Sequence, residues 1–462
     1  MCWCVCDSCL GTGRKKQKNR KPNSVQNDVI SEQTEIYKSI FKICKKCDGK
    51  GIVQSTEFPK TDVQKFPHIA IIGLGIAGIT LAVACLHRGI PFSIFERDAS
   101  FDVRSQGYGL TLQQASKILK ALGITTISNG IVSSRHLVHD VSGNVLASWG
   151  KRKWIPNENF KNSKKTNIHI ARQELRLMLL NQLITEKNVF WNHQLIDFKS
   201  DKINGNTLHF LVNGVKKEFK ADVIVGADGI RSVVRNQLFG LQYKPLQYLG
   251  CLVILGICPL DKLEHINSDL LDSATVFQTA NGMERIYIMP YANDSVMWQL
   301  SFPIKESEAI VLSKKGKFVL KKEAIKRTDW HSPIPEIVSA TDENLITGYP
   351  VYDREILENE LSEIDKPITL IGDAAHPMSP FKGQGANQAM LDGLALAQSI
   401  YAKFRFNQFN KSSIREFVLN NFETEMISRS SIKVKDSAEA ADFLHSKDVL
   451  SENNQPRRKL ND

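Results

Sequence analysis

The sequence predicts an α/β fold with a parallel sheet, an inserted and mostly antiparallel sheet, C-terminal helices and a small N-terminal cysteine module. Three observations predict it. Short apolar strands alternate with helical patterns after residue 66, which is typical of a parallel sheet with crossover helices. Residues 240–350 are strand-rich instead. Six of the nine cysteines lie within the first 47 residues.

The individual elements follow from local patterns. Residues 66–73 form a short apolar run that ends in glycines, as a buried parallel strand does. Residues 76–88 are rich in Ala and Leu and predict a helix, and 91–96 predict a second strand. The stretches 246–257, 284–290 and 295–302 predict the strands of the inserted sheet, and a polar tail fills 451–462.

Composition limits the class of protein. The 462 residues are 42% hydrophobic and 24% charged, which is ordinary for a globular chain. The longest apolar stretch, 248–260, is too short to span a bilayer, so we expect no transmembrane segment. The N-terminus has no basic region followed by a long apolar core, so it does not resemble a secretory signal. We therefore expect a cytoplasmic protein.

The net charge of +11 is unevenly distributed. Residues 1–66 hold 13 Lys and Arg against 7 Asp and Glu, more than half of the excess, and the densest run is 14–21. We interpret this run as a solvated basic loop, with a nucleic-acid or anionic-membrane patch as the alternative. No aromatic residues are interleaved with the basic ones, which argues against nucleic acid.

A glycine fingerprint follows the first strand and opens the first helix. Gly73 permits the tight turn, Gly75 lets a pyrophosphate approach the backbone, and Gly78 lets helix and strand pack closely. Glu96 ends the next strand and can accept hydrogen bonds from an adenosine ribose. The predicted dinucleotide contacts in this part of the chain are Gly73, Gly75, Ile76, Ala77, Gly78, Glu96 and Arg97.

Two later strands end in acidic turns. One runs into Asp228-Gly229, and the other into Gly372-Asp373, where an aspartate can accept from ribose or ribityl hydroxyls. A glycine-rich loop then feeds a helix from about 387 to 404, whose N-terminus can stabilise the electron-rich edge of a flavin ring. The predicted contacts of this loop are Gly383, Gln384, Gly385, Ala386 and Asn387. Together the three motifs predict an FAD site in a Rossmann-like domain.

In order and spacing, the three motifs resemble those of the class A FAD-dependent aromatic hydroxylases, and residues 66–445 carry the resemblance. The likeness to the tetracycline-inactivating branch is looser. The resemblance to the class A hydroxylases implies a body over 66–450. In this body, the FAD-binding parts lie at about 66–240 and 350–400, a substrate-side sheet lies at about 240–350, and helices cover 385–447. It also implies that Arg104 and Arg172 lie beside the FAD, and that the Asp228-Gly229 turn also contacts NAD(P)H.

The resemblance implies a reaction as well. NADPH or NADH would reduce the flavin, and a flavin C4a-hydroperoxide would hydroxylate an aromatic or polycyclic small molecule. The cofactor performs the difficult step, so no protein residue is predicted to be catalytic, and His376 is interpreted as structural rather than as a proton donor. A reductase or oxidase on the same fold is the alternative. A zinc-module interaction protein that uses the flavin fold as a scaffold is a third reading, disfavoured by the intact Glu96, Arg172 and Asp373.

The predicted inserted sheet offers a candidate wall for the substrate. Its large apolar residues alternate along the strands, and we expect them to form the sheet core, with substrate lining as the alternative. The residues concerned are Met283, Tyr287, Met289, Trp298 and Phe302.

Two copies of C-x-x-C-x-G-x-G lie within residues 1–54, ahead of a polar linker. Cys6, Cys9, Cys44 and Cys47 provide four thiolates, enough for one tetrahedral zinc ion. The motif resembles the zinc domain of J-domain co-chaperones, which carries four copies. A redox-active C-x-x-C is the alternative, and disulfides are not expected in the cytoplasm. Cys2 and Cys4 are spare ligands or reactive thiols, and the module is a candidate site for a protein or peptide partner.

Overall fold

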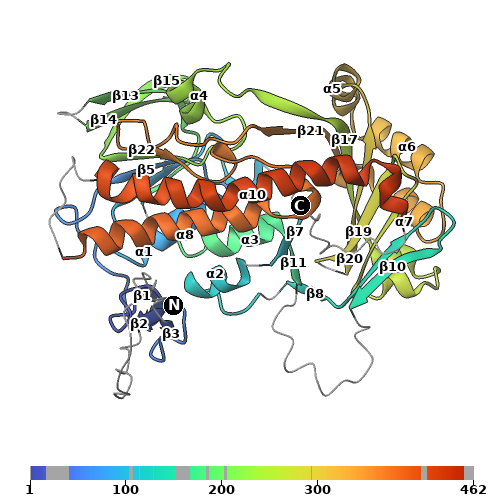
Figure 1. Ribbon diagram of the computed structural model, residues 1–462, viewed down its shortest axis with the longest axis horizontal. Coiled ribbons are helices and arrows are strands. Elements are labelled where there is room, and N and C mark those ends of the chain that lie inside the picture. The colour runs from blue at the N-terminus through green and yellow to red at the C-terminus, as the bar shows by residue number, and fades with distance from the viewer. Residues whose placement is uncertain are drawn as a thin grey trace, which may run out of the picture.

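The computed structural model describes most of the chain, and its layers are visible in Figure 1. The described residues are 2–16, 41–103, 108–113, 115–127, 129–150, 167–183, 187–201, 205–292, 294–406 and 414–451. Arg104, much of the basic run 14–21 and nearly all of the polar tail lie outside them. No helix in the described part is long and apolar enough to cross a membrane.

A five-stranded parallel sheet forms the centre of the body, in the order β12-β6-β5-β16-β22. Every residue of β5, β6, β16 and β22 is buried, as expected for strands covered on both faces. The predicted parallel sheet is therefore confirmed. Its strands are β5 (Ile69–Ile72), β6 (Phe92–Phe95), β12 (Val189–Phe190), β16 (Val223–Gly226) and β22 (Ile368–Leu370).

Helices and a small meander cover the two faces of this sheet. α1 packs so closely on α8 that a Cβ on Gly393 would lie 2.9 Å from the Ala77 carbonyl oxygen. On the other face, Phe95 of β6 stacks on Phe210 of the meander, with ring centroids 4.4 Å apart. The helices are α1 (Ile76–Leu86), α2 (Ala115–Ala121), α3 (Arg172–Leu180), α4 (Val233–Phe239) and α8 (Gly385–Phe404), and the meander is β13 (Gln194–Asp201), β14 (Gly205–Val212) and β15 (Val215–Ala221).

A seven-stranded sheet stands beside the parallel one, in the order β10-β9-β18-β19-β20-β17-β21. It is antiparallel except where β18 pairs with β9. Its strands are β9 (Arg135–His139), β10 (Val145–Gly150), β17 (Leu246–Pro259), β18 (Thr275–Ala280), β19 (Arg285–Tyr291), β20 (Ser295–Pro303) and β21 (Ile346–Arg354). The antiparallel sheet predicted over 240–350 is present, but it also contains β9 and β10 from 135–150. The prediction missed these two strands because a pairing over this distance leaves no local pattern in the sequence.

The remaining elements are short. The helices α5 (Glu306–Lys314), α6 (Lys317–Arg327) and α7 (Ile334–Ala340) cover one face of the seven-stranded sheet, where Trp298 and Phe302 lie in its core. A three-stranded sheet, β7 (Gly109–Leu112), β11 (Asn167–Ala171) and β8 (Ile131–Ser133), lies between the two large sheets (Figure 1). Short helices are η1 (Phe101–Val103), η3 (Leu260–Leu263), η4 (Asp269–Leu271), η5 (Glu343–Leu345) and η9 (Lys447–Leu450).

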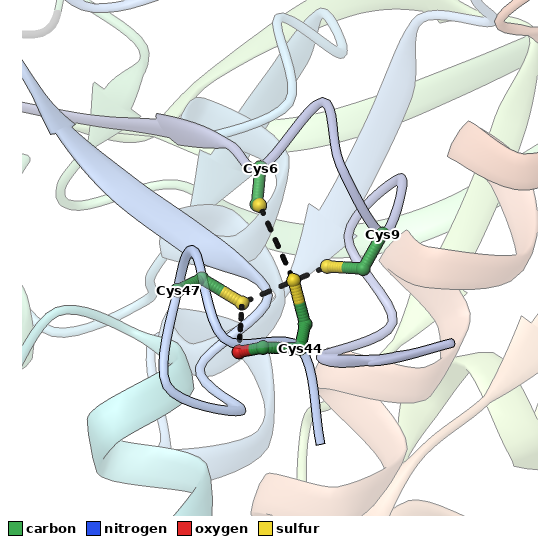
Figure 2. Close-up of side chains that lie close together, drawn as sticks. All are labelled: Cys6, Cys9, Cys44 and Cys47. Carbon is green, nitrogen blue, oxygen red and sulfur yellow. Dashed lines mark hydrogen bonds between the residues drawn. The ribbon is translucent and has the colours of Figure 1, made fainter. Parts of the chain in front are cut away.

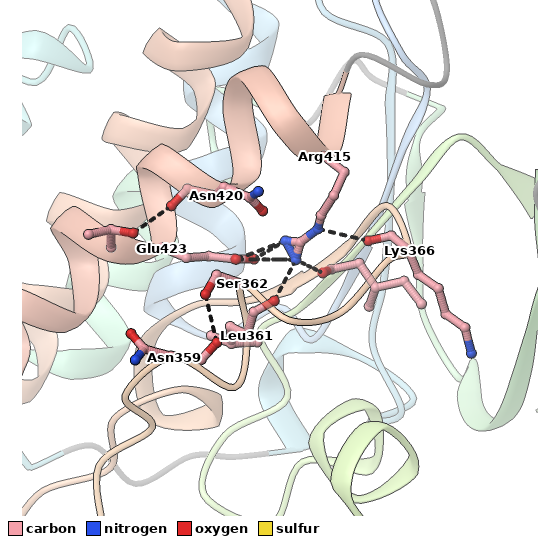
Figure 3. Close-up of polar contacts among 9 residues, drawn as sticks. Asn359, Leu361, Ser362, Lys366, Arg415, Asn420 and Glu423 are labelled. Carbon is pink, nitrogen blue, oxygen red and sulfur yellow. Dashed lines mark hydrogen bonds and ion pairs between the residues drawn. The ribbon is translucent and has the colours of Figure 1, made fainter.

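The C-terminal helix α10 (Asn420–Leu444), preceded by the π-helical turn η8 (Arg415–Leu419), spans both parts of the body (Figure 1). At its start, Arg415 forms a bidentate ion pair with the buried Glu423 and donates to the carbonyl oxygens of Leu361, Lys366 and Ile368 (Figure 3). Beyond its other end, His445 Nε2 lies 2.9 Å from the Ser301 hydroxyl oxygen of β20.

The N-terminal module is two small antiparallel ribbons. β1 (Cys2–Val5) pairs with β4 (Ile52–Ser55), and β2 (Arg14–Lys16) with β3 (Phe41–Ile43). Two contacts between described residues join the module to the body. Trp3 is buried against Gly123, where an added Cβ would lie 2.3 Å from the indole nitrogen. Gln398 of α8 donates to the Gly11 carbonyl oxygen over 3.1 Å.

Candidate functional site

One cavity of about 1020 Å³ lies between the carboxyl ends of the parallel strands and the seven-stranded sheet. All three predicted motifs reach it. The first contributes Gly75, Ile76 and Ala77, the second Gly229, and the third Asp373 together with 383–386. Arg172, at the start of α3, joins them. Ligands of open α/β sheets bind at this edge of the strands, so the arrangement suits a large dinucleotide.

The three fingerprint glycines differ in what a side chain at each position would meet. Gly73 has a φ of 104°, and a Cβ there would lie 2.5 Å from the Ala227 carbonyl oxygen. A Cβ on Gly78 would lie 2.0 Å from the Gly73 carbonyl oxygen, so any side chain would separate helix and strand. A Cβ on Gly75 would meet only one atom, at 3.9 Å, and would project into open space. That open space at the N-terminus of α1 fits a pyrophosphate.

Glu96 stabilises the backbone of the glycine turn by hydrogen bonds. Its carboxylate accepts from the backbone N–H of Leu74 over 2.9 Å and from that of Asp98 over 3.2 Å. Glu96 is buried and is not among the residues that line the cavity, while Arg97 is exposed. A ribose contact for either residue therefore stays a prediction.

The Asp228-Gly229 turn is built by the aspartate itself. Asp228 Oδ2 accepts from the N–H groups of Val233 and Val234 over 2.7 and 3.2 Å, which holds the start of α4. Its Oδ1 is buried without a hydrogen-bond partner in the described structure. Burial raises the pKa of Asp228. Gly229, with a φ of 81°, is the residue of this pair that lines the cavity.

The third motif places a carboxylate directly in the cavity. Gly372, at the start of η6 (Gly372–Ala374), has a φ of 60° that a side chain would strain. Asp373 is exposed, but to the cavity, whose walls raise the pKa of its carboxyl group while the nearby His376 and Arg172 oppose that shift. An acceptor that faces a cavity of ligand size fits the hydroxyls of a ribityl chain.

The loop that follows is clamped to β7 by amide side chains. Asn387 Nδ2 donates to the carbonyl oxygens of Thr111 and Gly383 over 3.0 and 2.9 Å, and its Oδ1 accepts from the Gln113 N–H. Gln384 donates to the Gln113 side chain over 2.7 Å. Asn387 is buried and does not line the cavity, so it positions the loop, together with the turn η7 (Pro380–Lys382), beside the open N-terminus of α8.

His376 lies in a buried ionic cluster behind the cavity. Its Nε2 is 2.7 Å from Asp392 Oδ2, which also accepts from the Gly372 N–H over 2.9 Å. Arg429 of α10 donates to the other Asp392 oxygen over 2.7 Å. His376 is not among the cavity-lining residues, and the contacts tie α8 and α10 to the Gly372-Asp373 turn. These contacts fit the structural role predicted for it.

Strand alternation places the predicted apolar residues of the seven-stranded sheet on two different faces, one of which forms the cavity wall opposite the loops. Tyr287 and Met289 line the cavity, and their cross-strand partners are Gln299 and Met297. Met289 is 2% exposed and belongs to a buried apolar cluster on this face, so the expectation of sheet core is confirmed for it. Tyr287 packs against that cluster, and both residues line the cavity as well. Trp298 and Phe302 point to the other face and form core as expected, whereas Met283 is 62% exposed because it lies in the turn before β19.

Several cavity residues were missed in the sequence. Arg285 lies two residues before Tyr287 on β19, and Gln299 lies two residues after Met297 on β20, so alternation along the two strands could have found them. His136 and His169 come from β9 and β11, and only the long-range pairing of those strands brings them here. Burial lowers the pKa of His136 to about 4 and that of His169 to about 3, so both are neutral at pH 7.

The four predicted cysteines form a second centre in the N-terminal module. Their sulfur atoms lie within 4.8 Å of one another, and all four side chains are buried. Figure 2 shows the side chains pointing toward one another from two separate knuckles. The backbone N–H groups of Gly13 and Gly51 each donate to a cysteine sulfur over 3.3 Å. Such bonds stabilise thiolates, and four thiolates at this spacing fit one tetrahedral zinc ion.

The two knuckles are built alike. The Cys6 N–H donates to the Gly51 carbonyl oxygen, and the Cys44 N–H to that of Gly13, each over 2.9 Å. A Cβ on Gly13 would lie 2.2 Å from the Gly49 carbonyl oxygen, and one on Gly51 would lie 2.4 Å from that of Gly11. The glycines are therefore required where the two copies of the motif cross.

Comparison with known proteins agrees with this site. Residues 67–405 match the family model of the FAD binding domain. Aurachin C monooxygenase/isomerase of Stigmatella aurantiaca is 28% identical over 336 residues, which cover 72% of this chain and 80% of that protein. The 6-hydroxynicotinate 3-monooxygenase of Pseudomonas fluorescens is 27% identical over 72% of this chain and 82% of its own length. A zeaxanthin epoxidase of Spinacia oleracea is 28% identical, but the chain spans only about half of it.

Solved structures share the fold. Klebsiella pneumoniae HpxO, complexed with FAD and uric acid, superposes with a TM-score of 0.67 at 19% identity, over 82% of this chain and 89% of that one. Tetracycline destructase Tet(51) matches with a TM-score of 0.57 at 19% identity, over 84% of this chain and 92% of that one. With the fingerprint, the acidic turns and the family match together, this chain belongs to the FAD binding domain family and is an oxidoreductase of the FAD-dependent monooxygenase type.

Proposed function

We propose that the protein uses NAD(P)H and O2 to hydroxylate an aromatic or polycyclic small molecule in the described cavity. The observation that carries this proposal is the composition of the cavity. One side presents the dinucleotide loops, and the other presents Met289, Met297 and Tyr287 on a sheet wall. A flavin held by the loops would face these methionine and tyrosine side chains, which suit a planar substrate and help to exclude water from the reacting atoms.

Different residues of the cavity would hold different parts of FAD. Gly75 and the N-terminus of α1 would receive the pyrophosphate, and Asp373 would accept from the ribityl hydroxyls. The loop 383–386 and the N-terminus of α8 would lie along the ring, where the helix dipole favours negative charge. The bound cofactor supplies the hydride acceptance and oxygen activation, so the protein residues bind, orient and exclude water.

The test is to load the purified protein with FAD and follow NADPH and NADH oxidation with and without a panel of phenols. We expect a flavin spectrum, substrate-stimulated consumption of the reduced nicotinamide, and an oxygenated product by mass spectrometry. Stimulated consumption without an oxygenated product would favour the alternative reductase or oxidase. A protein that cannot be reconstituted with FAD would contradict the proposal itself.

Replacing Asp373 with alanine is expected to weaken FAD retention about 10- to 100-fold, because a charge-assisted hydrogen bond contributes about 1.5–3 kcal/mol. The measurement is the FAD dissociation constant, from quenching of flavin fluorescence. Asp436→Ala is the matched control, since Asp436 also lines the cavity but is paired with Lys433. Equal affinity in the Asp373 variant and the parent would show that Asp373 does not contact the cofactor.

We also propose that Cys6, Cys9, Cys44 and Cys47 hold one structural zinc ion. Buried thiols at ligand spacing support it, as does the reciprocal fit of the two knuckles. A cytoplasmic location is a further proposal, because four thiolates that serve as metal ligands persist in a reducing compartment. The contact of the module with α8 supports a role in covering the body, and a protein or peptide partner at the module stays a prediction.

A further inference from the structure

The ribbon formed by β2 and β3 in the N-terminal module exposes two large apolar side chains. Phe41 is 52% exposed and Ile43 is 67% exposed. They lie two residues apart on β3, so both point to one face of the ribbon, and Arg14 of β2 lies opposite Ile43 in the register. We call this side of the ribbon, Phe41 and Ile43 with Arg14, the apolar face. Single exposed apolar residues are common, but two on one face of a three-residue strand form a distinct patch.

The cysteine centre fixes the direction of the ribbon. Gly13 directly precedes β2 and Cys44 directly follows β3, and the Cys44 N–H donates to the Gly13 carbonyl oxygen over 2.9 Å. The contacts with the body come from other parts of the module, from the buried Trp3 and from the Gly11 carbonyl oxygen. In Figure 1, β2 and β3 lie below α1 and α8. The apolar face is therefore presented to solvent and is not folded onto the body.

Basic side chains surround the apolar face. The described residues of the module contain seven Lys and Arg against two Asp and Glu. Lys15 and Lys42 lie opposite each other on the other face of the ribbon, and Lys45 is exposed next to Cys44. Among these described residues, the ion pair found is that of Lys46 with Asp7, so the charges of the ribbon itself have no carboxylate partner there.

The proposed zinc centre leaves the module positive. Four thiolates and one divalent ion carry two negative charges together, fewer than the excess of basic residues. A partner with negative charge and an apolar layer would therefore be complementary to the ribbon. An anionic lipid bilayer has both, because its phosphates attract Lys and Arg while aromatic and aliphatic side chains enter the boundary with the acyl chains.

The arrangement of these side chains favours a bilayer over a macromolecule of another class. Sites that stack single-stranded nucleic acid use several aromatic residues, and the described ribbon has one, Phe41. A peptide site gathers its contacts in a groove or along one edge, whereas the basic residues here occupy both faces of a narrow ribbon. A bilayer needs no groove, because long lysine side chains reach the phosphates from either face while the apolar face enters the interface.

We propose that the β2–β3 ribbon binds anionic lipid membranes, with Phe41 and Ile43 in the interface and the basic side chains at the lipid phosphates. The attachment is reversible and sensitive to salt, because two apolar side chains and a few lysines are too little for a permanent anchor. The ribbon lies outside the cavity, so this attachment does not depend on the proposed flavin chemistry.

The test is co-sedimentation of the full-length protein, purified with its metal and loaded with FAD, with lipid vesicles. Vesicles of phosphatidylcholine are compared with vesicles that contain about one third phosphatidylserine. At about 0.1 M salt we expect the anionic vesicles to bind the protein at least about 10-fold more tightly than the neutral ones. At about 0.5 M salt that difference should be largely lost, because the surface charges are screened.

The apolar face is tested by the double variant Phe41→Ser with Ile43→Ser. It should weaken binding to the anionic vesicles about 10- to 100-fold, because two apolar side chains no longer leave water. The matched control is Leu241→Ser. Leu241 is 71% exposed and follows α4, which lies at the other edge of the molecule in Figure 1, so this variant should bind as the parent does.

The charge is tested separately by Lys42→Gln with Lys45→Gln, which should weaken binding about 10- to 30-fold. Its control is Lys216→Gln with Lys217→Gln, which removes two exposed lysines from β15 and should have no effect. The replaced side chains of the ribbon are exposed, so the module should stay folded, and limited proteolysis checks this. The two double variants provide independent evidence if one of them unfolds.

Three results would overturn the inference. The first is equal binding to neutral and anionic vesicles, or binding to neither. The second is binding that survives in both ribbon variants. The third is tighter binding to a labelled oligoglutamate or to a single-stranded oligonucleotide than to the anionic vesicles, which would assign the ribbon to a peptide or a nucleic acid. Failure to oxidise NADPH would contradict the proposed function but not this inference, because vesicle binding is measured without turnover.

Discussion

Replacing Cys44 with serine is expected to release the metal from the N-terminal module and to unfold its four strands, β1 to β4. Among the described residues of this module, the buried apolar cluster consists of the four cysteines with Val53 packed against them, so we expect the metal to provide most of its stability. Structural zinc binds such sites with an apparent free energy of about 10–16 kcal/mol. The measurements are zinc per chain by elemental mass spectrometry and limited proteolysis of the module. The body has a separate core, so the FAD content should persist.

Cys4→Ser is the matched control for this prediction. Cys4 lies on β1, two residues from Cys6, but it is not part of the four-sulfur cluster. The variant should keep one zinc per chain, which would decide that Cys4 is not a spare ligand. Equal zinc content in the Cys44 variant and the parent would contradict the proposed metal site. Loss of zinc in the Cys4 variant would show that the ligand set is different.

Replacing Arg415 with alanine is expected to lower the free energy of unfolding by about 3–5 kcal/mol. The variant leaves Glu423, which is 1% exposed, without its bidentate partner, and it removes the donors to the Leu361, Lys366 and Ile368 carbonyl oxygens. Burial raises the pKa of Glu423 to about 7 although Arg415 opposes that shift, so the carboxylate is costly to bury alone. Denaturant unfolding, followed by circular dichroism with FAD present, measures the loss.

The double variant Arg415→Met with Glu423→Leu distinguishes the cost of leaving one charge unpaired from the loss of the other contacts of Arg415. Removing both charges is expected to recover much of the lost stability, since a buried ion pair is often replaceable by apolar residues of similar volume. Surface pairs contribute at most about 1 kcal/mol, so Lys46→Ala, which breaks the exposed pair with Asp7, is the control with a small effect. A loss below about 1 kcal/mol for Arg415→Ala would show that the buried network is not a stabilising joint.

Much of the cofactor side of the site could be predicted because its requirements are local. The positive φ of Gly73 and the contact of Gly78 with the Gly73 carbonyl oxygen depend on backbone geometry within six residues, although Gly73 also lies against the Ala227 carbonyl oxygen. Asp373 likewise sits where a strand ends, and strand ends of a parallel sheet meet at one edge. The cysteine centre could be predicted for the same reason, because each C-x-x-C knuckle is a local motif and a single contact between the two knuckles completes the site. Glu96 shows the limit of this reasoning, since its observed partners are the N–H groups of Leu74 and Asp98, which spacing alone does not reveal.

The sequence by itself determined the parallel sheet, the FAD family and the four cysteines, because turns, strand ends and knuckles are short-range features with few physical solutions. Only the tertiary structure decided which residues meet the substrate. β9 joins the second sheet through a partner 140 residues away, and this pairing brings His136 to the cavity. The face of β19 that carries Arg285 and Met289 points inward because the opposite face is covered by α5 to α7. Such choices depend on which layers pack together, and that is a property of the whole chain rather than of any segment.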